Sequence, residues 1–491
     1  MKTLNRILAA SAAALMIGGA EAKVVLPSFY ADNMVLQQKA NMTIKGKANP
    51  GSTVKFTPSW NKKTVLTKAD AQGNFAVKFT VPTASMKPYT LTFSDGDGET
   101  VLSNILTGEV WLCSGQSNME MTVQGWGMIN NNAQEVAEAE KYPMIRVLQV
   151  KMSGRQPSPV DDTEFTKIWE VMSPETAKLT SAVAYMFARD LYNALHVPIG
   201  IVQSAYGGAT AESWVSKDVA SKFPDLNDVM AKCAAVGFNR DSIKSKYNII
   251  EQHAPTLCYN TMLYPLHVLP VKGAIWYQGC SNANPWGIKF YTQLMDSLIS
   301  SWRTLWGYTF PFYYVQLAGF MDQVTVQPDA DYAGLRHCQW KSLTMPRTGM
   351  ATAVDIGNQK DIHPKNKQDV AHRLAFLALN KTYGKKNVVC EAPHPVKSEI
   401  SGNKMLITFN GKIHARNDSV ACGFIAADSD GKFVEATAKI TGPTTISVSA
   451  PSLAKIATVR YDWANYPIGN IYGPTNLPVW PFRTDDMVLK K

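Results

Sequence analysis

The sequence predicts an α/β domain with a mostly parallel sheet, flanked before and after by a smaller β-sandwich-like module. Between about residues 107 and 384, apolar strand-like runs alternate with helical stretches, which is the pattern of a parallel sheet covered by helices. On either side of this region, short segments alternate apolar and polar residues between turn residues, as half-buried strands do. A chain of 491 residues also exceeds the size of a single hydrophobic core. We therefore predict modules at residues 23–106, 107–384 and 385–491.

The first 22 residues read as a signal peptide and not as part of the fold. Lys2 and Arg6 form a basic start, residues 7–19 are a short apolar run, and Ala20-Glu21-Ala22 places small residues where a signal peptidase reads. The apolar run is shorter than the roughly 20 residues that a membrane span needs. We expect cleavage after Ala22, export to a periplasm or to the exterior, and no membrane span.

Composition describes an ordinary folded protein and gives no sign of a nucleic-acid partner. The chain is 45% hydrophobic and 18% charged. Removal of Lys2, Arg6 and Glu21 with the leader leaves 47 basic and 38 acidic residues, a net charge of +9. The basic residues are scattered, and no nucleic-acid-binding motif is present. Seven cysteines, odd in number and without Cys-x-x-Cys spacing, indicate neither a zinc knuckle nor a disulfide framework, although one bridge stays possible.

The segment from residue 23 to 106 predicts a small antiparallel β-sandwich. Turn residues at 49–51 and 72–74 separate its apolar-polar runs. The predicted strands are residues 42–46, 53–56, 75–81 and 89–93. Nothing in this segment indicates catalysis, so we expect a structural or glycan-orienting role.

The central region predicts the domain that carries the chemistry, because ligands of parallel α/β sheets bind at the carboxyl ends of the strands. The predicted strands are residues 110–113, 144–150, 199–203, 273–277, 312–317 and 350–354. The predicted helices are residues 181–195, 290–306 and 368–383.

Beyond about residue 384 the β pattern resumes. The predicted strands are residues 405–409, 423–427, 445–449 and 458–461. Asp428-Ser-Asp-Gly431 is a turn signal between strands. The segment from Leu477 to Asp485 is aromatic but irregular, and we expect it to pack back on the larger domain.

Ser117 is the first candidate for catalysis. It follows the apolar strand Val110–Cys113, within small and amide-bearing residues. A serine at the end of a rigid element can act as a nucleophile if a base reaches it. The alternative is structural: Ser117 caps a helix, and Glu120, three residues on, completes a capping box.

Two further strand ends carry candidate hydrogen-bond donors. Gly207 and Gly208 follow the strand that starts at residue 199, and glycines let backbone N–H groups approach a ligand closely. Gln278 and Asn282 follow the strand at 273–277, and their amides could stabilise charge that develops in a transition state. The alternatives are an ordinary turn at the glycines and a buried glutamine that holds a loop together.

His363 is the best candidate for a general base among the eight histidines. It lies in the loop Asp355–Lys367, with Asp361 two residues before it and Pro364 after it. A neutral imidazole can take a serine proton near pH 7, and Asp361 would orient the ring and stabilise the imidazolium. The order Ser, Asp, His differs from those of chymotrypsin and subtilisin, and no Gly-x-Ser-x-Gly elbow surrounds Ser117.

These segments together resemble the sialate O-acetylesterase family of SGNH-type hydrolases, over nearly the whole chain after the leader. The matching motifs are Ser114-Gly-Gln-Ser-Asn-Met-Glu120, Gly207-Gly208 with Glu212-Ser-Trp214, Trp276-Tyr-Gln-Gly and Asp361-Ile-His-Pro. The resemblance implies an SGNH-like three-layer catalytic domain. It also implies Ser117 as nucleophile, His363 as base and Asp361 as its partner. The implied oxyanion hole comprises the Ser117 backbone, the Gly207-Gly208 turn and one amide, with Gln278 preferred to Asn282.

Two positions depart from the family pattern. Cys280 stands where relatives commonly have a glutamate. Many SGNH enzymes have an aspartate three residues before the histidine, a position that Lys360 occupies here. Asp355 therefore stays a reserve candidate for the acid.

The sequence thus predicts an exported carbohydrate O-acetylesterase that acts on O-acetylated sialic acids through a serine acetyl-enzyme, with no metal or organic cofactor. Two alternatives stay open. One is an acetylesterase for acetylxylan or another plant polysaccharide. The other is a glycan-binding protein that has kept this scaffold but lost turnover, which Cys280 suggests. The sequence does not indicate an oligomeric state.

Overall fold

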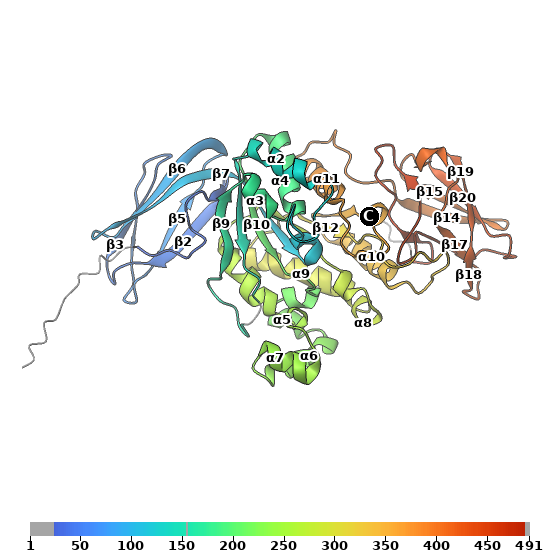
Figure 1. The fold of residues 1–491 in the computed structure, drawn as a ribbon, viewed down its shortest axis with the longest axis horizontal. Helices are drawn as coiled ribbons and strands as arrows, with labels where there is room; N and C mark the ends of the chain where they lie inside the picture. The colour runs from blue at the N-terminus through green and yellow to red at the C-terminus, as the bar shows by residue number, and fades with distance from the viewer. Residues whose placement is uncertain (1–23, 154–155, 487–491) are drawn as a thin grey trace, which may run out of the picture.

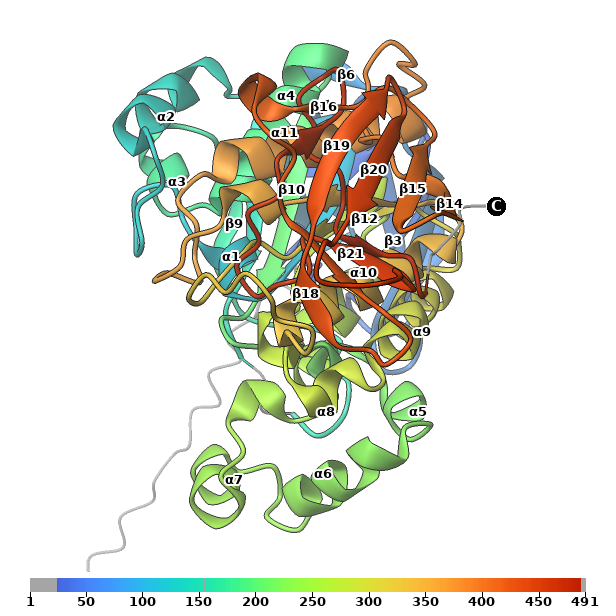
Figure 2. The same ribbon diagram turned by 90° about the vertical axis from the view of Figure 1, so that its right-hand side faces the viewer.

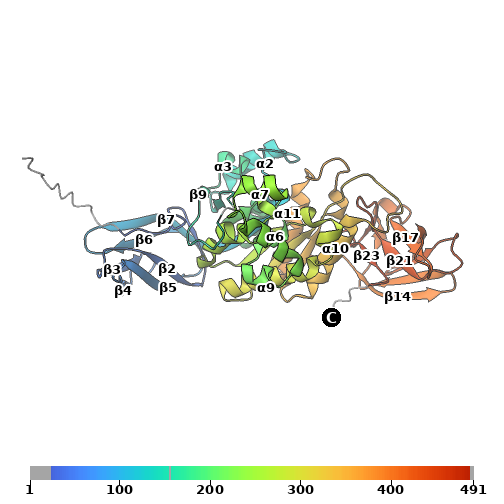
Figure 3. The ribbon, with the colours of Figure 1, turned by 90° about the horizontal axis from the view of Figure 1, so that it is seen from below.

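The computed structural model describes residues 24–153 and 156–486, so the predicted leader at residues 1–22 lies outside the described residues. Three parts follow one another along the long axis of the molecule: a blue β module, a green-to-yellow α/β domain and an orange-to-red β module (Figure 1 and Figure 3). Within the described chain, no helix is both long enough and apolar enough to cross a bilayer.

A mixed sheet forms the centre of the α/β domain. Its strand order is β13-β12-β11-β7-β10-β8-β9, and every neighbouring pair is parallel except β8 with β9. The strands are β7 (Glu99–Gly115), β8 (Ile145–Val150), β9 (Phe165–Val171), β10 (Ile199–Ala205), β11 (Gly273–Tyr277), β12 (Phe312–Gln316) and β13 (Thr348–Thr352). The mostly parallel α/β fold predicted for this region is therefore confirmed.

Helices cover both faces of this sheet. Trp111 of β7 packs against Phe187 of α4 on one face, and Trp276 of β11 packs against Trp302 of α9 on the other. Both tryptophans are buried, as expected for a sheet whose two faces are both covered by helices. Helix α11 packs on α4 and on β12 and β13. The domain is thus a helix-sheet-helix arrangement.

The predicted helices are confirmed with small changes at their ends. Ser181 caps α4 by accepting from the N–H of Ala184, and the third predicted helix ends as an α-helix at Leu377 and continues as a π-helical turn. Helices α6 and α7 project from the domain over a small apolar cluster of their own (Figure 2). The helices are α1 (Ser117–Glu120), α2 (Asn132–Glu138), α3 (Pro174–Lys178), α4 (Ala182–Leu195), α5 (Lys217–Ala220), α6 (Pro224–Ala234), α7 (Arg240–Tyr247), α8 (Pro285–Ile288), α9 (Tyr291–Trp306), α10 (Asp331–Lys341) and α11 (Lys367–Leu377).

Strand β7 joins the first two parts of the molecule. Its first half pairs with β6 and β1, and its second half lies between β10 and β11. The predicted boundary between residues 106 and 107 falls inside this strand. The N-terminal module is therefore continuous, through one strand, with the element that leads to Ser117.

The N-terminal module consists of two packed sets of strands, consistent with the predicted β-sandwich. Phe56 of β3 contacts Phe79 of β5, and Phe75 of β5 contacts Phe93 of β6, so side chains from both sets meet in one core. The strands are β1 (Val35–Gln37), β2 (Asn41–Lys47), β3 (Thr53–Pro58), β4 (Val65–Lys68), β5 (Asn74–Thr80) and β6 (Ser85–Ser94).

The C-terminal module contains two four-stranded sheets and a short two-stranded one. The predicted turn at Asp428–Gly431 links β17 to β18, and Gly431 has the positive φ of +73° that such a turn favours. The strands are β14 (Pro395–Ser401), β15 (Lys404–Phe409), β16 (His414–Ala415), β17 (Phe424–Ala427), β18 (Phe433–Glu435), β19 (Thr437–Gly442), β20 (Thr445–Ser449), β21 (Thr458–Tyr461), β22 (Ile471–Tyr472) and β23 (Phe482–Arg483). The seven cysteines are all unbridged thiols.

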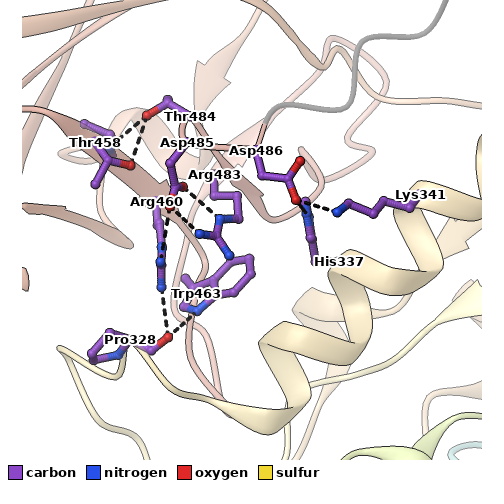
Figure 4. A network of polar contacts seen from close by, with 11 residues as sticks. Pro328, His337, Lys341, Thr458, Arg460, Trp463, Arg483, Thr484, Asp485 and Asp486 are labelled. Carbon is purple, nitrogen blue, oxygen red and sulfur yellow. Dashed lines mark hydrogen bonds and ion pairs between the residues drawn. The ribbon is translucent and has the colours of Figure 1, made fainter. Parts of the chain in front are cut away.

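The end of the chain packs back on the α/β domain, as predicted. Trp480 contacts Trp340 of α10, and Asp486 accepts from Lys341 and lies 3.1 Å from His337 Nε2 (Figure 4). In the same view, Arg460 and Trp463 both donate to the carbonyl of Pro328, just before α10. The C-terminal module is therefore held to α10 by several polar contacts.

Arg336 of α10 makes a fully buried link between the α/β domain and the C-terminal module. It donates to the carbonyls of Ala464 and Ala318 and is fully buried. Burial raises the pKa of the nearby Asp462 to about 7, although the Gly469 N–H and the charge of Arg336 act to lower it. Arg336 thus provides both hydrogen bonds and charge to a site from which water is excluded.

We predict that Arg336→Met lowers the free energy of unfolding by about 3 kcal/mol, because it leaves two buried carbonyls without their donor and removes the cation that faces Asp462. The melting temperature by differential scanning calorimetry measures the loss. Lys232→Met is the control: its exposed ion pair with Asp228 is expected to contribute less than about 1 kcal/mol. Equal melting temperatures of the two variants would contradict the role given to Arg336.

Candidate active site

The predicted site residues meet at the carboxyl edge of the central sheet. Ser117 follows β7, Gly207 and Gly208 follow β10, Gln278 and Asn282 follow β11, and the His363 loop follows β13. Because parallel strands end at the same edge, loops that are far apart in the sequence converge here.

The end of β7 is shaped by Gly115. Its φ is +144°, and a Cβ built on it would lie 2.2 Å from the carbonyl oxygen of Tyr277 on β11. The next residue, Gln116, donates its N–H to that carbonyl and accepts the Gly279 N–H at its side-chain oxygen, at 2.9 Å. The chain can therefore turn out of the sheet beside β11, and it places Ser117 directly after the turn.

Ser117 Oγ lies 2.9 Å from His363 Nε2, which is hydrogen-bonding distance. The capping-box alternative does not describe this serine, because the residue at the N-cap of α1 is Gln116, no side chain caps the helix, and Glu120 accepts the Gly207 N–H instead. The hydroxyl is thus bonded to a possible general base.

The two candidate acids occupy different surroundings. Asp361 Oδ1 lies 3.6 Å from His363 Nδ1 and accepts the backbone N–H of His363 at 2.9 Å. Asp355 forms a buried bidentate pair with Arg373, at 2.7 and 2.9 Å, and also accepts from Tyr472. These contacts favour Asp361 over Asp355 as the partner of the imidazole.

The surroundings of His363 favour its neutral form. Its pKa is lowered first by partial burial and then by the charge of Lys367, while Asp361 acts to raise it. The imidazole also packs against Trp126 in a T-shaped arrangement, with ring centroids 5.0 Å apart, and 42% of Trp126 is exposed. The base is therefore ready to accept a proton at neutral pH, beside an exposed aromatic ring.

The two glycines differ in what their backbones can offer. The Gly207 N–H already donates to Glu120, whose pKa is raised by burial. Gly208 has a φ of +73°, and its carbonyl accepts from Ser281 Oγ and lies 3.0 Å from His253 Nε2. Its N–H has no acceptor among the described residues. Gly208 is thus the better placed of the pair to donate to a ligand.

The two amides after β11 belong to one buried network. Gln278 Nε2 donates to the carbonyl of Ala209 and to Asn282 Oδ1, at 3.1 and 2.7 Å, so both of its N–H groups are engaged. Asn282 Nδ2 donates to Glu212 at 2.8 Å, which leaves its second N–H without an acceptor in the described part of the chain. These bonds favour Asn282 over Gln278 as an oxyanion donor, contrary to the preference drawn from the sequence.

Sequence reasoning missed two residues beside the predicted triad, Asn118 and Lys367. Both are buried, and Lys367 Nζ donates to Asn118 Oδ1. Asn118 could have been suspected from its position after Ser117. Lys367 gave no signal, because a lysine in the first turn of a helix normally lies in solvent. Cys280 is also close, with its Sγ 3.9 Å from Asn118 Nδ2.

The arrangement has the parts of an acyl-transfer site: a hydroxyl bonded to a neutral imidazole, a carboxylate behind the imidazole, and N–H groups after the two strands that flank β7. Across the described residues, no group of three His, Cys, Asp or Glu side chains is arranged to hold a metal ion.

Comparisons with known proteins agree on one class of enzyme. The family model described as carbohydrate esterase, sialic acid-specific acetylesterase, matches residues 107–379. The sialate O-acetylesterase of Mus musculus is 29% identical, over 89% of this chain and 89% of its own. That of Homo sapiens is 28% identical, over 93% of this chain and 91% of its own. A crystal structure of a carbohydrate acetylesterase from Xanthomonas citri matches with a TM-score of 0.82 and 34% identity, covering 94% of this chain and 100% of that one.

We predict that Gly115→Ala destabilises the protein by more than about 3 kcal/mol, because the new Cβ meets the Tyr277 carbonyl as well as an unfavourable φ. Gly51→Ala separates the two effects. Gly51 also has a positive φ, +75°, but no atom lies within 4 Å of its Cβ position, so about 1 kcal/mol is expected. Thermal unfolding compares the two, and equal losses would contradict the close approach of β7 to β11.

Proposed function

Because the chain belongs to the family of sialic acid-specific carbohydrate acetylesterases, which are hydrolytic esterases, we propose that it is an exported serine esterase that removes O-acetyl groups from sialic acids. The observation that carries the serine mechanism is the 2.9 Å contact between Ser117 Oγ and His363 Nε2. Export rests on the leader pattern of residues 1–22.

In the proposed reaction, Ser117 Oγ attacks the acetyl carbonyl carbon while its proton passes to His363 Nε2. The tetrahedral intermediate then collapses, the bond from the acetyl carbon to the sugar oxygen breaks, and the imidazolium gives its proton to that oxygen. The acetyl group is now an ester of Ser117. A water molecule loses a proton to His363 and attacks this ester, and the bond from the acetyl carbon to Ser117 Oγ breaks as that oxygen takes the proton back from His363. Acetic acid leaves and gives its remaining proton to solvent.

The carbonyl oxygen becomes negatively charged at each tetrahedral stage, and N–H donors aimed at it lower the barrier. We assign this role to the backbone N–H groups of Ser117 and Gly208 and to the unpaired N–H of Asn282. Gly207 and Gln278 support these donors, because their own N–H groups bond within the protein. Each donor of this kind typically contributes on the order of 3 kcal/mol.

Asp361 is the proposed partner of the imidazolium that forms during each step. At 3.6 Å from Nδ1 its carboxylate acts through charge, and a small movement of the loop would bring it within hydrogen-bonding distance. Burial raises the pKa of the Cys280 thiol to about 11, so this residue stays neutral. It therefore cannot supply the negative charge of a glutamate at this position.

The proposal predicts that the wild-type protein releases acetate from O-acetylated sialic acid and that Ser117→Ala lowers kcat by at least about a thousandfold at an unchanged melting temperature. Acetylated xylan, assayed in parallel, tests the plant-polysaccharide alternative. Faster release from xylan would replace the proposed substrate. No turnover of any acetyl ester, including p-nitrophenyl acetate, by wild type would support the glycan-binding alternative.

A second prediction concerns pH. Since the pKa of His363 is lowered from 6.5, kcat/KM should rise with pH and level off, with the midpoint of its acid limb below pH 6.5. Asp361→Asn removes the carboxylate that raises this pKa, so the midpoint should move lower still, together with a lower plateau. Asp355→Asn is the control and should leave the midpoint in place. A shift in Asp355→Asn alone would assign the acid to Asp355.

A further inference from the structure

Lys367 is a lysine that the fold buries completely. It is the first residue of α11, four residues after His363, and its relative exposure is 0%. Its Nζ donates to Asn118 Oδ1 at 2.5 Å and lies 5.6 Å from the centroid of the Tyr277 ring. Within the described chain, no carboxylate lies within 4.0 Å of this amine. A buried amine without a counter-ion is costly, so its retention calls for a reason.

The partner of Lys367 connects the two halves of the proposed active site. Asn118 directly follows Ser117, and its Nδ2 donates at 3.0 Å to the carbonyl of Ile362, which directly precedes His363. One amide thus spans the helix that carries the nucleophile and the loop that carries the base. An ammonium or amine N–H facing Oδ1 also fixes which way the amide points, so that its NH₂ group must face the Ile362 carbonyl.

Asp361 accepts the backbone N–H of His363 at 2.9 Å, but its contact with the imidazole ring is weaker than the bonds of Asn118. The Asp361 carboxylate is 3.6 Å from His363 Nδ1, and its side chain is 44% exposed. An exposed contact of that length restrains the imidazole little. The bonds from Lys367 to Asn118 and from Asn118 to Ile362 are shorter, and both side chains are buried.

We infer that Lys367 is a positioning residue of the proposed esterase: through Asn118 it holds the His363 loop at the distance from Ser117 that proton transfer requires. The inference rests on the proposed serine mechanism and adds to it two residues that do not touch the reacting atoms.

The charges that face Lys367 are consistent with this role. Burial lowers its pKa to about 7, while the charge of Asp361 acts to raise it. Its positive charge in turn lowers the pKa of His363. In either protonation state the nitrogen keeps N–H groups that can donate to Asn118, so the positioning contact survives the titration.

The test uses Lys367→Met, which keeps the length of the side chain and removes its donor. We expect kcat for acetate release to fall at least tenfold while KM stays within twofold, since the loop positions the base and not the sugar. The melting temperature should change little, because the removal of an uncompensated buried amine offsets the loss of the donor to the buried Asn118 Oδ1. Lys365→Met, an exposed lysine of the same loop, is the matched control and should leave all three values unchanged.

Asn118→Asp gives a second route to the same result. The new aspartate supplies Lys367 with a carboxylate but cannot donate to the Ile362 carbonyl, so kcat should fall at least tenfold. This test does not depend on whether Lys367→Met folds. A kcat within twofold of wild type in either folded variant would overturn the inference. It would leave the proposed function intact as long as wild type is active and Ser117→Ala is not. An inactive wild type would overturn the proposed function first.

Discussion

The contact between Ser117 and His363 joins residues 246 positions apart in the chain, and most of the central domain lies between them. It forms only if β7 and β13, which are separated by two strands in the sheet, end at the same edge and if both loops turn toward each other. The parallel pairing of the strands provides the first condition. Gly115 and the buried amide of Asn118 provide the second, one at the turn before the serine and one between the two loops.

Burial shifts the pKa of several ionisable groups of the site in the direction of their neutral forms. It raises the pKa of Glu120, Glu212 and Cys280, and it lowers the pKa of His363 and Lys367. In each case the shift favours the neutral form of the group. Charge that develops on a substrate oxygen would therefore meet few competing charges in a medium where electrostatic interactions are strong. A neutral cysteine at position 280 fits this pattern, whereas an ionised glutamate would need a counter-ion such as Lys367, whose charge already acts on Cys280.

The sequence predicted much of the fold because its periodicity is strong, as in the apolar runs of β7, β10 and β11 and in the amphipathic α9. It also pointed to Ser117 and His363, whose residue types and strand-end positions are informative. It could not separate Gln278 from Asn282, or Gly207 from Gly208, because the choice depends on which N–H groups bond inside the protein. The burial of Lys367 could not be predicted from the sequence either, because it results from packing between elements that are distant in the sequence. The continuity of β7 across the predicted boundary was missed because a change of periodicity does not require a change of strand.

The serine mechanism requires that Ser117 is acetylated during turnover. Rapid acid quenching of wild type during hydrolysis of O-acetylated sialic acid, followed by peptide mass spectrometry, tests this claim directly. We expect one added acetyl group on the peptide that contains Ser117, accumulating further in Asp361→Asn if that change slows deacetylation more than acetylation. Acetyl transfer to a different residue would exclude Ser117 as the nucleophile, and so would steady acetate release that persists in Ser117→Ala.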